Sequence, residues 1–408
     1  MSASRLRLVV GVCLIGASAN ILAQETAAAT KSSPLKADLL DATYLSGLNA
    51  VVVTGHHGVI GQLKIDADKA SLELLAEHPD EDFTCIEAIG ESQALVGSAT
   101  GRVYSYDGKT ITEVAALSEF NEPVLDIAAN GPQNIWAVGA RGLIARSTDG
   151  KTFTAVEPRD VTQPPTTFPA GHPADWYFGV SNLNLDSVQF SATVGGKPAV
   201  ADNDYTLYPD EGFVQVVNAL DENPAPTIGF TFNPGPPFRA GDVSWNVVLV
   251  TGDKVTLAGE FGMVLQSDDN GATWVRRDTR IVPREPEPAY WLSGVAKGDQ
   301  IWLAGAAGIS MVSNDGGLTW NDNPAPGREG IFGITLANDG KPVIAGAVGL
   351  IGVLDNNQWK LADRTQLKLL SWLKTPVPMP DGSILVAGGR ATAIRYKDGN
   401  WTRVQIDL

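Results

Sequence analysis

Short apolar runs that lead into a glycine turn recur along the chain. A typical copy is "WAVGARGLI", in which an apolar strand meets a Gly, two variable residues, a second Gly and another apolar run. The other copies are "VVTGHHGVI", "LVGSATGRV", "TLAGEFGMV", "WLAGAAGIS", "VIAGAVGLI" and the degenerate "LVAGGRATAI". Runs rich in Val, Ile, Thr and Trp that are bounded by Gly predict β-strands joined by tight turns.

The spacing of the copies predicts the architecture. Successive first glycines are 42, 42, 120, 46, 41 and 42 residues apart, at Gly55, Gly97, Gly139, Gly259, Gly305, Gly346 and Gly388. A period of about 40 to 45 residues with four short strands, A to D, is typical of a β-propeller blade. We therefore expect an all-β fold, a seven-bladed β-propeller with blades 1–3 in residues 39–157 and blades 4–7 in 244–408.

The long interval contains about 78 residues more than one period. Residues 158–243 are rich in Pro and aromatic residues, and their middle part alternates as strands do. We expect a β-rich module inserted between the third and fourth blades. Because it joins strand D to the next strand A, it should rise from the face where such connections lie. Trp176, Tyr177 and Phe178 would form its surface, unless they belong to its own core.

A second motif follows strand C. It is "SDDNGATW" at 267–274 and "SNDGGLTW" at 313–320, with a looser "STDGKTF" at 147–153. An Asp carboxylate in such a turn accepts backbone N–H bonds, Gly supplies a positive φ, and the aromatic ring fills the space between sheets. We expect purely structural roles for Asp149, Asp269, Trp274, Asp315 and Trp320, on the face opposite the glycine turns.

This motif is similar to the Asp-box, or bacterial neuraminidase repeat, of sialidases, xyloglucanases and sortilin-type propellers. The longer string "GLIARSTDGKTF" looks most like the photosystem II assembly-factor subgroup. "DNNQW" and "KDGNW" resemble eroded copies, and the first two blades lack the terminal aromatic residue. The resemblance implies a propeller whose front face holds a segment of a membrane protein.

The N-terminus predicts export. A basic start with Arg5 and Arg7, the apolar run "LVVGVCLIGA" and a small-residue exit are typical of a signal peptide. We expect residues 1–24 to be removed, 25–38 to be a linker, and the protein to be periplasmic with no membrane insertion after cleavage. Removal of Cys13 would leave Cys85 as the only cysteine, so no internal disulfide is expected.

The charge narrows the choice of partner. The formal net charge is −16, and the loss of two arginines would give −16 − 2 = −18. Such an acidic chain is a poor ligand for nucleic acid or for an anionic membrane surface, since both attract cations. A protein partner is expected instead.

Strands B and C are joined on the same face as the connections from strand D to the next strand A. We call this the front face. The side chains expected to bind there are His56, His57, Arg141, Glu260, Phe261, Arg284 and Arg390. Clustered arginines in an acidic protein would bind a carboxylate in fork geometry, whereas the simpler interpretation is that each is a solvated surface residue.

Enzyme chemistry finds little support. A sialidase-like site needs three convergent Arg and a Tyr nucleophile, and the Phe/Tyr-Arg-Ile-Pro motif of that family is absent. A xyloglucanase-like site needs two carboxylates across a cleft, in a pair of propellers. His56 and His57 have no partner at metal-ligand spacing. No catalytic residue, metal or cofactor is therefore expected.

These features predict a non-enzymatic periplasmic protein-binding scaffold. By analogy, it would be an accessory or assembly factor of an inner-membrane complex, such as an RND/MMPL-type lipid or hydrophobe transporter. The alternative is a carbohydrate-active or carbohydrate-binding propeller, similar to a sialidase- or xyloglucanase-like glycoside hydrolase.

Overall fold

A computed structural model describes residues 38–66, 69–76, 80–159, 161–167, 176–179, 189–208, 213–221, 227–232, 243–277 and 289–407. The predicted signal peptide and nearly all of the predicted linker lie outside these residues. The regular elements in the described part are β-strands and single turns of 3₁₀-helix. None of its helices is long and apolar enough to cross a membrane.

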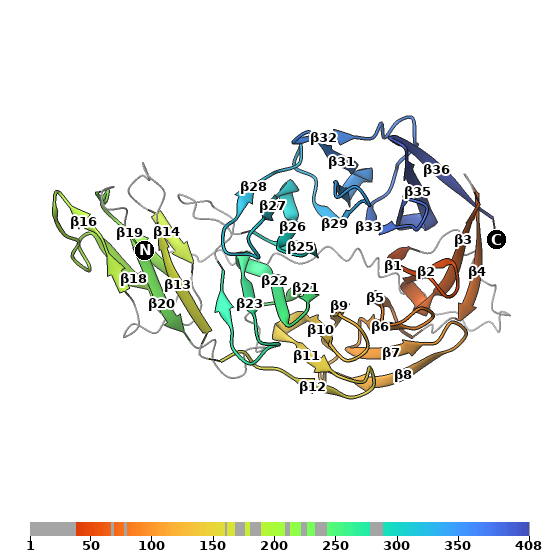
Figure 1. The fold of residues 1–408 in the computed structure, drawn as a ribbon, viewed down its shortest axis with the longest axis horizontal. Helices are drawn as coiled ribbons and strands as arrows, with labels where there is room; N and C mark the ends of the chain where they lie inside the picture. Colours follow the sequence, from red (N-terminus) through yellow and green to blue (C-terminus); the bar gives the residue numbers. More distant parts are fainter. Residues whose placement is uncertain are drawn as a thin grey trace, which may run out of the picture. The chain divides into compact units, whose positions relative to one another are not determined.

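The strands form four-stranded antiparallel units, which we call blades and number in chain order (Figure 1). The first three consist of β1 (Leu39–Leu45), β2 (Ala50–Gly55), β3 (Ile60–Asp66), β4 (Lys69–Ala76); β5 (Phe83–Ala88), β6 (Ala94–Ser98), β7 (Arg102–Tyr106), β8 (Ile111–Ala116); and β9 (Val124–Ala129), β10 (Ile135–Gly139), β11 (Ile144–Ser147), β12 (Phe153–Ala155).

The later blades have the same order of strands. They consist of β21 (Trp245–Thr251), β22 (Lys254–Gly259), β23 (Val264–Ser267), β24 (Val275–Arg276); β25 (Trp291–Lys297), β26 (Gln300–Gly305), β27 (Ser310–Ser313), β28 (Asn321–Asp322); β29 (Ile331–Leu336), β30 (Pro342–Gly346), β31 (Ile351–Asp355), β32 (Gln358–Leu361); and β33 (Leu373–Pro378), β34 (Ile384–Gly388), β35 (Thr392–Lys397), β36 (Asn400–Asp407).

The first strand of each blade lies at the centre. Contacts run in a cycle from β1 to β5, β9, β21, β25, β29 and β33, and back to β1. The outermost strands of the first and last blades also pair, since β36 runs parallel to β4 with Gln405 opposite Lys69. The chain thus closes its ring by joining two outer edges, and each of these two blades keeps its own four consecutive strands.

The hydrophobic core lies between neighbouring blades. One cluster combines Val52 and Ile60 of the first blade with Phe83 and Val96 of the second, all fully buried. Trp136 and Trp274 pack edge to face across the boundary of the third and fourth blades, with ring centroids 6.0 Å apart. Burial of such large side chains on both faces of a blade is the main stabilising term.

In every copy of the repeated turn except the second, the first glycine is required by a close backbone approach. A Cβ on Gly259 would lie 2.1 Å from the carbonyl oxygen of Ser244, and one on Gly139 would lie 2.1 Å from that of Pro123. The second copy is one residue out of the predicted register. Ser98, and not Gly97, pairs with Phe83 as Gly55 pairs with Leu39.

The described part of the predicted insertion is also β-structure. Its strands are β13 (Val161–Thr167), β14 (Trp176–Gly179), β15 (Gln189–Ser191), β16 (Thr193–Val194), β17 (Lys197–Pro198), β18 (Tyr205–Tyr208), β19 (Phe213–Val216) and β20 (Thr227–Phe232). They form a three-stranded sheet, β14-β19-β18, a two-stranded one, β16-β17, and a continuation of the fourth blade. The surface predicted for Trp176, Tyr177 and Phe178 concerns side chains outside the described part.

The insertion attaches differently from the expectation that it stands on the front face. β13 runs parallel to β24, with Thr162 opposite Val275, and it extends the sheet of the fourth blade at its outer edge. Thr162 donates its backbone N–H to the carbonyl of Trp274 at 3.1 Å. The physical reason is that the outermost strand of a blade has an unpaired edge, which accepts a further strand.

Candidate functional site

The turns between the second and third strands share one backbone shape. Six of them form a single 3₁₀ turn: η2 (His56–Gly58), η3 (Ala140–Gly142), η5 (Glu260–Gly262), η6 (Ala306–Gly308), η7 (Ala347–Gly349) and η8 (Gly389–Ala391). The middle residue of each is left-handed, with φ of 57° at His57, 53° at Arg141 and 56° at Phe261. This conformation is uncommon for residues other than Gly. The side chains of these middle residues are exposed.

These turns are tied to the segments that lead into the next blade. His57 donates its backbone N–H to Asp82 Oδ1 at 2.8 Å, and Arg390 donates its own to Asp38 Oδ1 at 2.8 Å. Gly142 N–H bonds to the carbonyl of Val243 at 2.7 Å. The two kinds of connection therefore form one face, the front face defined above.

The Asp-box turns lie on the opposite face with the turns between the first and second strands. Asn270 N–H bonds to the carbonyl of Asp253, and Gly316 N–H to that of Asp299, both at 2.8 Å. Asp269 Oδ1 accepts Ser267 Oγ at 2.7 Å and Thr273 N–H at 2.8 Å. Hydrogen bonds from the Thr273 hydroxyl and N–H lower the pKa of Asp269 to about 2. Its carboxylate is thus occupied by its own turn.

The other boxes repeat this geometry. Asp149 Oδ1 accepts N–H bonds from Lys151 and Thr152 at 2.8 and 2.7 Å, and these bonds lower its pKa to about 2. Asp315 Oδ1 accepts Thr319 N–H at 2.9 Å. Trp274 is buried and Trp320 is partly buried. Each indole donates its N–H to a glycine carbonyl of its own box at 3.1 Å.

Two of the residues predicted to bind on the front face make contacts within the fold. His56 Nδ1 lies 3.1 Å from Asp82 Oδ2. Glu260 Oε2 accepts the N–H of Ser244 and Oε1 accepts the hydroxyl of Tyr290, both at 2.8 Å, so this carboxylate anchors the entrance of two blades. Neither residue's contacts could be foreseen, because their partners lie in other segments of the repeat.

The remaining residues predicted to bind on the front face either have exposed side chains or lie outside the described residues. Arg141 reaches Glu122 only at 4.0 Å and is 61% exposed. Arg390 and His57 are exposed, and Phe261 is 59% exposed. Arg284 lies outside the described residues. The cluster of arginines expected from the sequence is therefore represented here by Arg141 and Arg390, which belong to different blades.

Sequence reasoning missed two apolar side chains of the front face. Phe120 is 73% exposed and Leu370 is 85% exposed, in the connections that precede β9 and β33. Val348, in the middle of η7, is 66% exposed. Together with Phe261 they give the front face four exposed large apolar residues. A signal was present, since "SEFNEP" and "LKLLSW" place an apolar residue within a polar or turn-rich connection.

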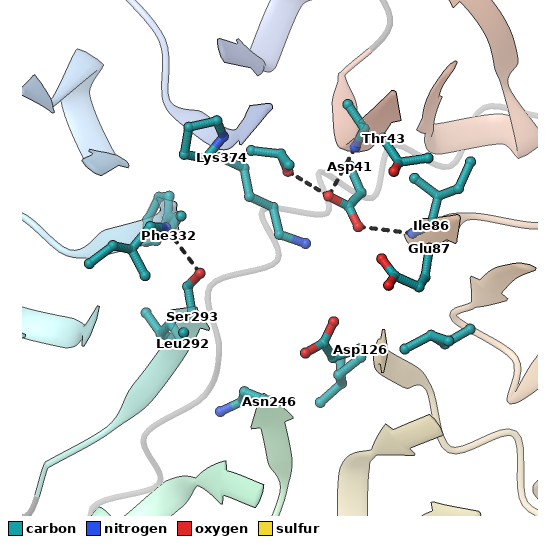
Figure 2. A pocket seen from close by; sticks show the side chains of 18 residues that line it. Asp41, Thr43, Ile86, Glu87, Asp126, Asn246, Leu292, Ser293, Phe332 and Lys374 are labelled. Atoms are coloured by element: carbon teal, nitrogen blue, oxygen red, sulfur yellow. Dashed lines mark hydrogen bonds between the residues drawn. The ribbon is translucent and has the colours of Figure 1, made fainter. Parts of the chain in front are cut away.

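A pocket of about 190 Å³, here called the tunnel, lies between the inner strands (Figure 2). Its lining includes three carboxylates and one ammonium group, from Asp41, Glu87, Asp126 and Lys374. Figure 2 shows these side chains pointing into the tunnel. None of the four was predicted. Asp41 and Asp126 have equivalent places in their strands, two residues after the buried Leu39 and Val124, so the repeat itself contained the signal.

The polar groups of the tunnel join each inner strand to its neighbour. Asp41 Oδ2 accepts Ile86 N–H at 2.9 Å, Asp126 Oδ2 accepts Val248 N–H at 2.8 Å, and Ser293 Oγ accepts Ile334 N–H at 3.1 Å. Between β29 and β33 the backbones approach directly. A Cβ on Gly333 would lie 1.5 Å from the carbonyl oxygen of Lys374. The residues that line the tunnel thus connect the inner strands of neighbouring blades.

Burial changes the protonation of two of these groups. It raises the pKa of Glu87 to about 8, with the negative charge of Asp126 as the next cause. It also raises the pKa of Asp126 to about 7, against the opposing N–H bond from Val248. Desolvation favours the neutral form of a carboxyl group. Glu87 is therefore mostly protonated at neutral pH.

In the described ranges, no group of three His, Cys, Asp or Glu side chains is placed to hold a metal ion. The four-stranded blades with their inner strands in a cyclic order decide the fold. The chain folds as a β-propeller. No family model matches this propeller, and no curated protein matches it.

Solved propellers resemble it at low sequence identity. The WD40 β-propeller domain of Doa1 is 9% identical, with a TM-score of 0.51 over 89% of this chain and 93% of that one. YCF48 bound to D1 peptide is 10% identical, with a TM-score of 0.43 over 91% and 82% of the two chains. YCF48 from Cyanidioschyzon merolae is 12% identical, with a TM-score of 0.47 over 78% and 82%.

The Asp-box turns of the propeller are distributed differently from the sequence motif. In the second blade, Asp107 Oδ1 accepts N–H bonds from Lys109 and Thr110 at 2.9 and 2.7 Å, as Asp149 does in the third. In the sixth and seventh blades the supposed eroded copies are two-residue hairpin turns, with positive φ at Asn356, Asn357, Asp398 and Gly399. Such paired left-handed residues match the twist of the strands.

Proposed function

We propose that the chain is a seven-bladed propeller that acts as a non-enzymatic scaffold and binds an extended segment of a partner protein on its front face. The observation that carries the proposal is the group of exposed apolar side chains there, formed by Phe120, Phe261, Val348 and Leu370. Exposed aromatic and aliphatic groups that share a face are typical of protein interaction sites. The cyclic contacts of the seven inner strands support the number of blades.

The charges of the front face define the partner further. Arg141 and Arg390 present exposed guanidinium groups, whereas the carboxylates of Asp82 and Glu260 are engaged by the backbone of the turns. Exposed arginines beside apolar side chains suit a segment that carries both apolar residues and a carboxylate. A chain end or a loop of a membrane protein has this composition.

The setting of this interaction follows from the sequence. The expected signal peptide supports a periplasmic location, and the Asp-box repeat resembles that of propellers that assist membrane complexes. We assign the chain the role of accessory or assembly factor of an inner-membrane complex, such as an RND/MMPL-type transporter.

The test is site-specific photo-crosslinking in intact cells of the source bacterium. A photoreactive residue replaces Phe261 or Val348 on the front face, and Leu318 as the matched control. Leu318 is equally exposed, at 61%, but it belongs to an Asp-box turn on the opposite face. We expect both front positions to capture the same inner-membrane protein and Leu318 to capture none. Equal capture at Leu318, or no adduct from either front position, would contradict the proposal.

A further inference from the structure

A cavity of about 510 Å³ lies between the sixth and seventh blades, away from the tunnel. Its walls come from the turn between β29 and β30, from β31 and β32, and from the hairpin of β35 and β36. The lining includes Asn338, Lys360, Tyr396 and Trp401. Its volume is within the range of small-ligand pockets, about 300 to 1,000 Å³.

The cavity exists because a short turn replaces an Asp-box. In the fifth blade the box covers the boundary with the fourth, where a Cβ on Gly317 would lie 2.2 Å from Gln266 Nε2. In the seventh blade the turn of Asp398 and Gly399 is two residues long, and a Cβ on Gly399 would meet no atom within 4 Å. The boundary between the sixth and seventh blades is therefore left open at this place.

Two aromatic rings line the open boundary. Tyr396 and Trp401 lie with ring centroids 4.6 Å apart. The indoles of Trp274, Trp320 and Trp359 each donate their N–H to a backbone carbonyl. For Trp401 no such bond exists within the described part of the chain. The cavity thus offers an apolar ring surface together with a free donor.

The charges of the lining are nearly balanced. Lys341 Nζ lies 3.1 Å from Asp339 Oδ2 and 3.3 Å from Asp355 Oδ1, and Lys360 pairs with Asp355 as well. With Asp398, three carboxylates face two ammonium groups, which gives a formal charge of 2 − 3 = −1. Such a lining attracts neither phosphates nor divalent cations strongly, because two of its three carboxylates are already paired. It presents donors and acceptors side by side.

We propose that this cleft binds a neutral saccharide ring. The apolar C–H face of the sugar would lie on Trp401, and its hydroxyl groups would bond to Lys360, Asp355 and Asn338. A hydroxyl both donates and accepts, so it matches paired ammonium and carboxylate groups better than a charged ligand does. The site is independent of the front face and of the protein partner.

The test uses saturation-transfer difference NMR on the full exported chain, with glucose, galactose and N-acetylglucosamine as probes at millimolar concentration. The key variant is Asn338→Trp, which fills the cavity from an exposed turn. The matched control is Lys297→Trp, at the exposed end of β25 in the fifth blade. A second variant, Trp401→Leu, removes the ring.

We expect at least one sugar to give a transfer signal with the unmodified protein and with Lys297→Trp. The signal should vanish with Asn338→Trp, and affinity should fall about tenfold with Trp401→Leu, which is the usual scale of one aromatic contact. If no sugar gives a signal, or if the signal persists unchanged in Asn338→Trp, the proposal is overturned. A failed fold of Trp401→Leu would not matter, because Asn338→Trp leaves the core untouched.

Discussion

Thr375 donates its hydroxyl to Asp41 Oδ1 at 2.6 Å, and so the last inner strand of the propeller is bonded to the first. The same carboxylate accepts the N–H of Ile86 through its other oxygen at 2.9 Å. One side chain in β1 therefore links β33, β1 and β5. A toroidal fold needs a strong closure because opening at one boundary separates the two ends of the chain.

Replacement of Asp41 should therefore destabilise the whole ring. Asp41→Ala leaves the N–H of Ile86 and the hydroxyl of Thr375 without their partner, and we expect a loss of about 2 to 3 kcal/mol in the free energy of unfolding. Thr375→Val removes one bond and should cost about 1 kcal/mol. Urea denaturation followed by tryptophan fluorescence measures both. Thr402→Val, at an exposed position, is the control, and an equal loss there would refute the closure role.

Stability should depend on pH through the tunnel. The folded-state pKa values of Glu87 and Asp126, about 8 and about 7, lie above the ordinary values of 4.5 and 3.8. The folded protein then holds protons that the unfolded chain releases. This contribution is complete below about pH 4 and is lost as the pH rises through 7 and 8. We expect the melting temperature to fall from pH 5 to pH 8.5.

Two variants test whether Glu87 and Asp126 cause this fall in melting temperature with pH. Glu87→Gln and Asp126→Asn keep the shape of the side chain but cannot ionise, so the fall in melting temperature should flatten. The Asp-box carboxylates act in the opposite sense, because their pKa values are lowered to about 2 and their contribution is lost only as the pH falls below about 4. A flat profile in the unmodified protein would show that the tunnel carboxyls titrate normally.

Glycine is required at position 271 both by the backbone conformation and by the close side chain of Trp136. Its φ is +89°, and a Cβ there would lie 2.4 Å from Trp136 Cη2. Gly131 also has a positive φ, +76°, but a Cβ there would meet nothing within 4 Å. Gly131→Ala should cost about 1 kcal/mol for the left-handed backbone alone. Gly271→Ala should cost about 1 to 3 kcal/mol more, because the Trp136–Trp274 contact must shift. Equal melting temperatures of the two variants would contradict this.

The sequence repeat predicted those features that depend on residues close together in the chain. The glycine turns, the strands around them and the Asp-box bonds of Asp269 and Asp315 follow from residues close together in the sequence. What depends on contacts between blades was not visible. Glu260 appeared to be a free carboxylate on the front face, yet it binds Ser244 and Tyr290, 16 and 30 residues away. The path of the predicted insertion depends on the open edge of β24, which no local sequence pattern indicates.

The Asp-box sequence pattern and the hydrogen-bonded geometry of the turn do not always coincide. "SYDGKT" in the second blade matches "STDGKT" in the third at all but one position, yet the missing aromatic residue concealed it. "KDGNW" keeps the aromatic residue and has a different turn. The carboxylate bonds, which need Asp followed by donors at the right spacing, define the clip better than the Trp does.

Removal of the carboxylate should therefore separate true clips from apparent ones. Asp107→Ala and Asp149→Ala each delete a group that accepts two backbone N–H bonds, and each should lower the urea concentration at the midpoint of unfolding. Asp398→Ala should cost less than either, since that carboxylate holds no N–H of its turn within the described part of the chain. Urea denaturation of the three variants measures the order. If Asp398→Ala were the most destabilising of the three, carboxylate bonds would not define the clip. If Asp107→Ala had no effect, the second blade would lack a clip.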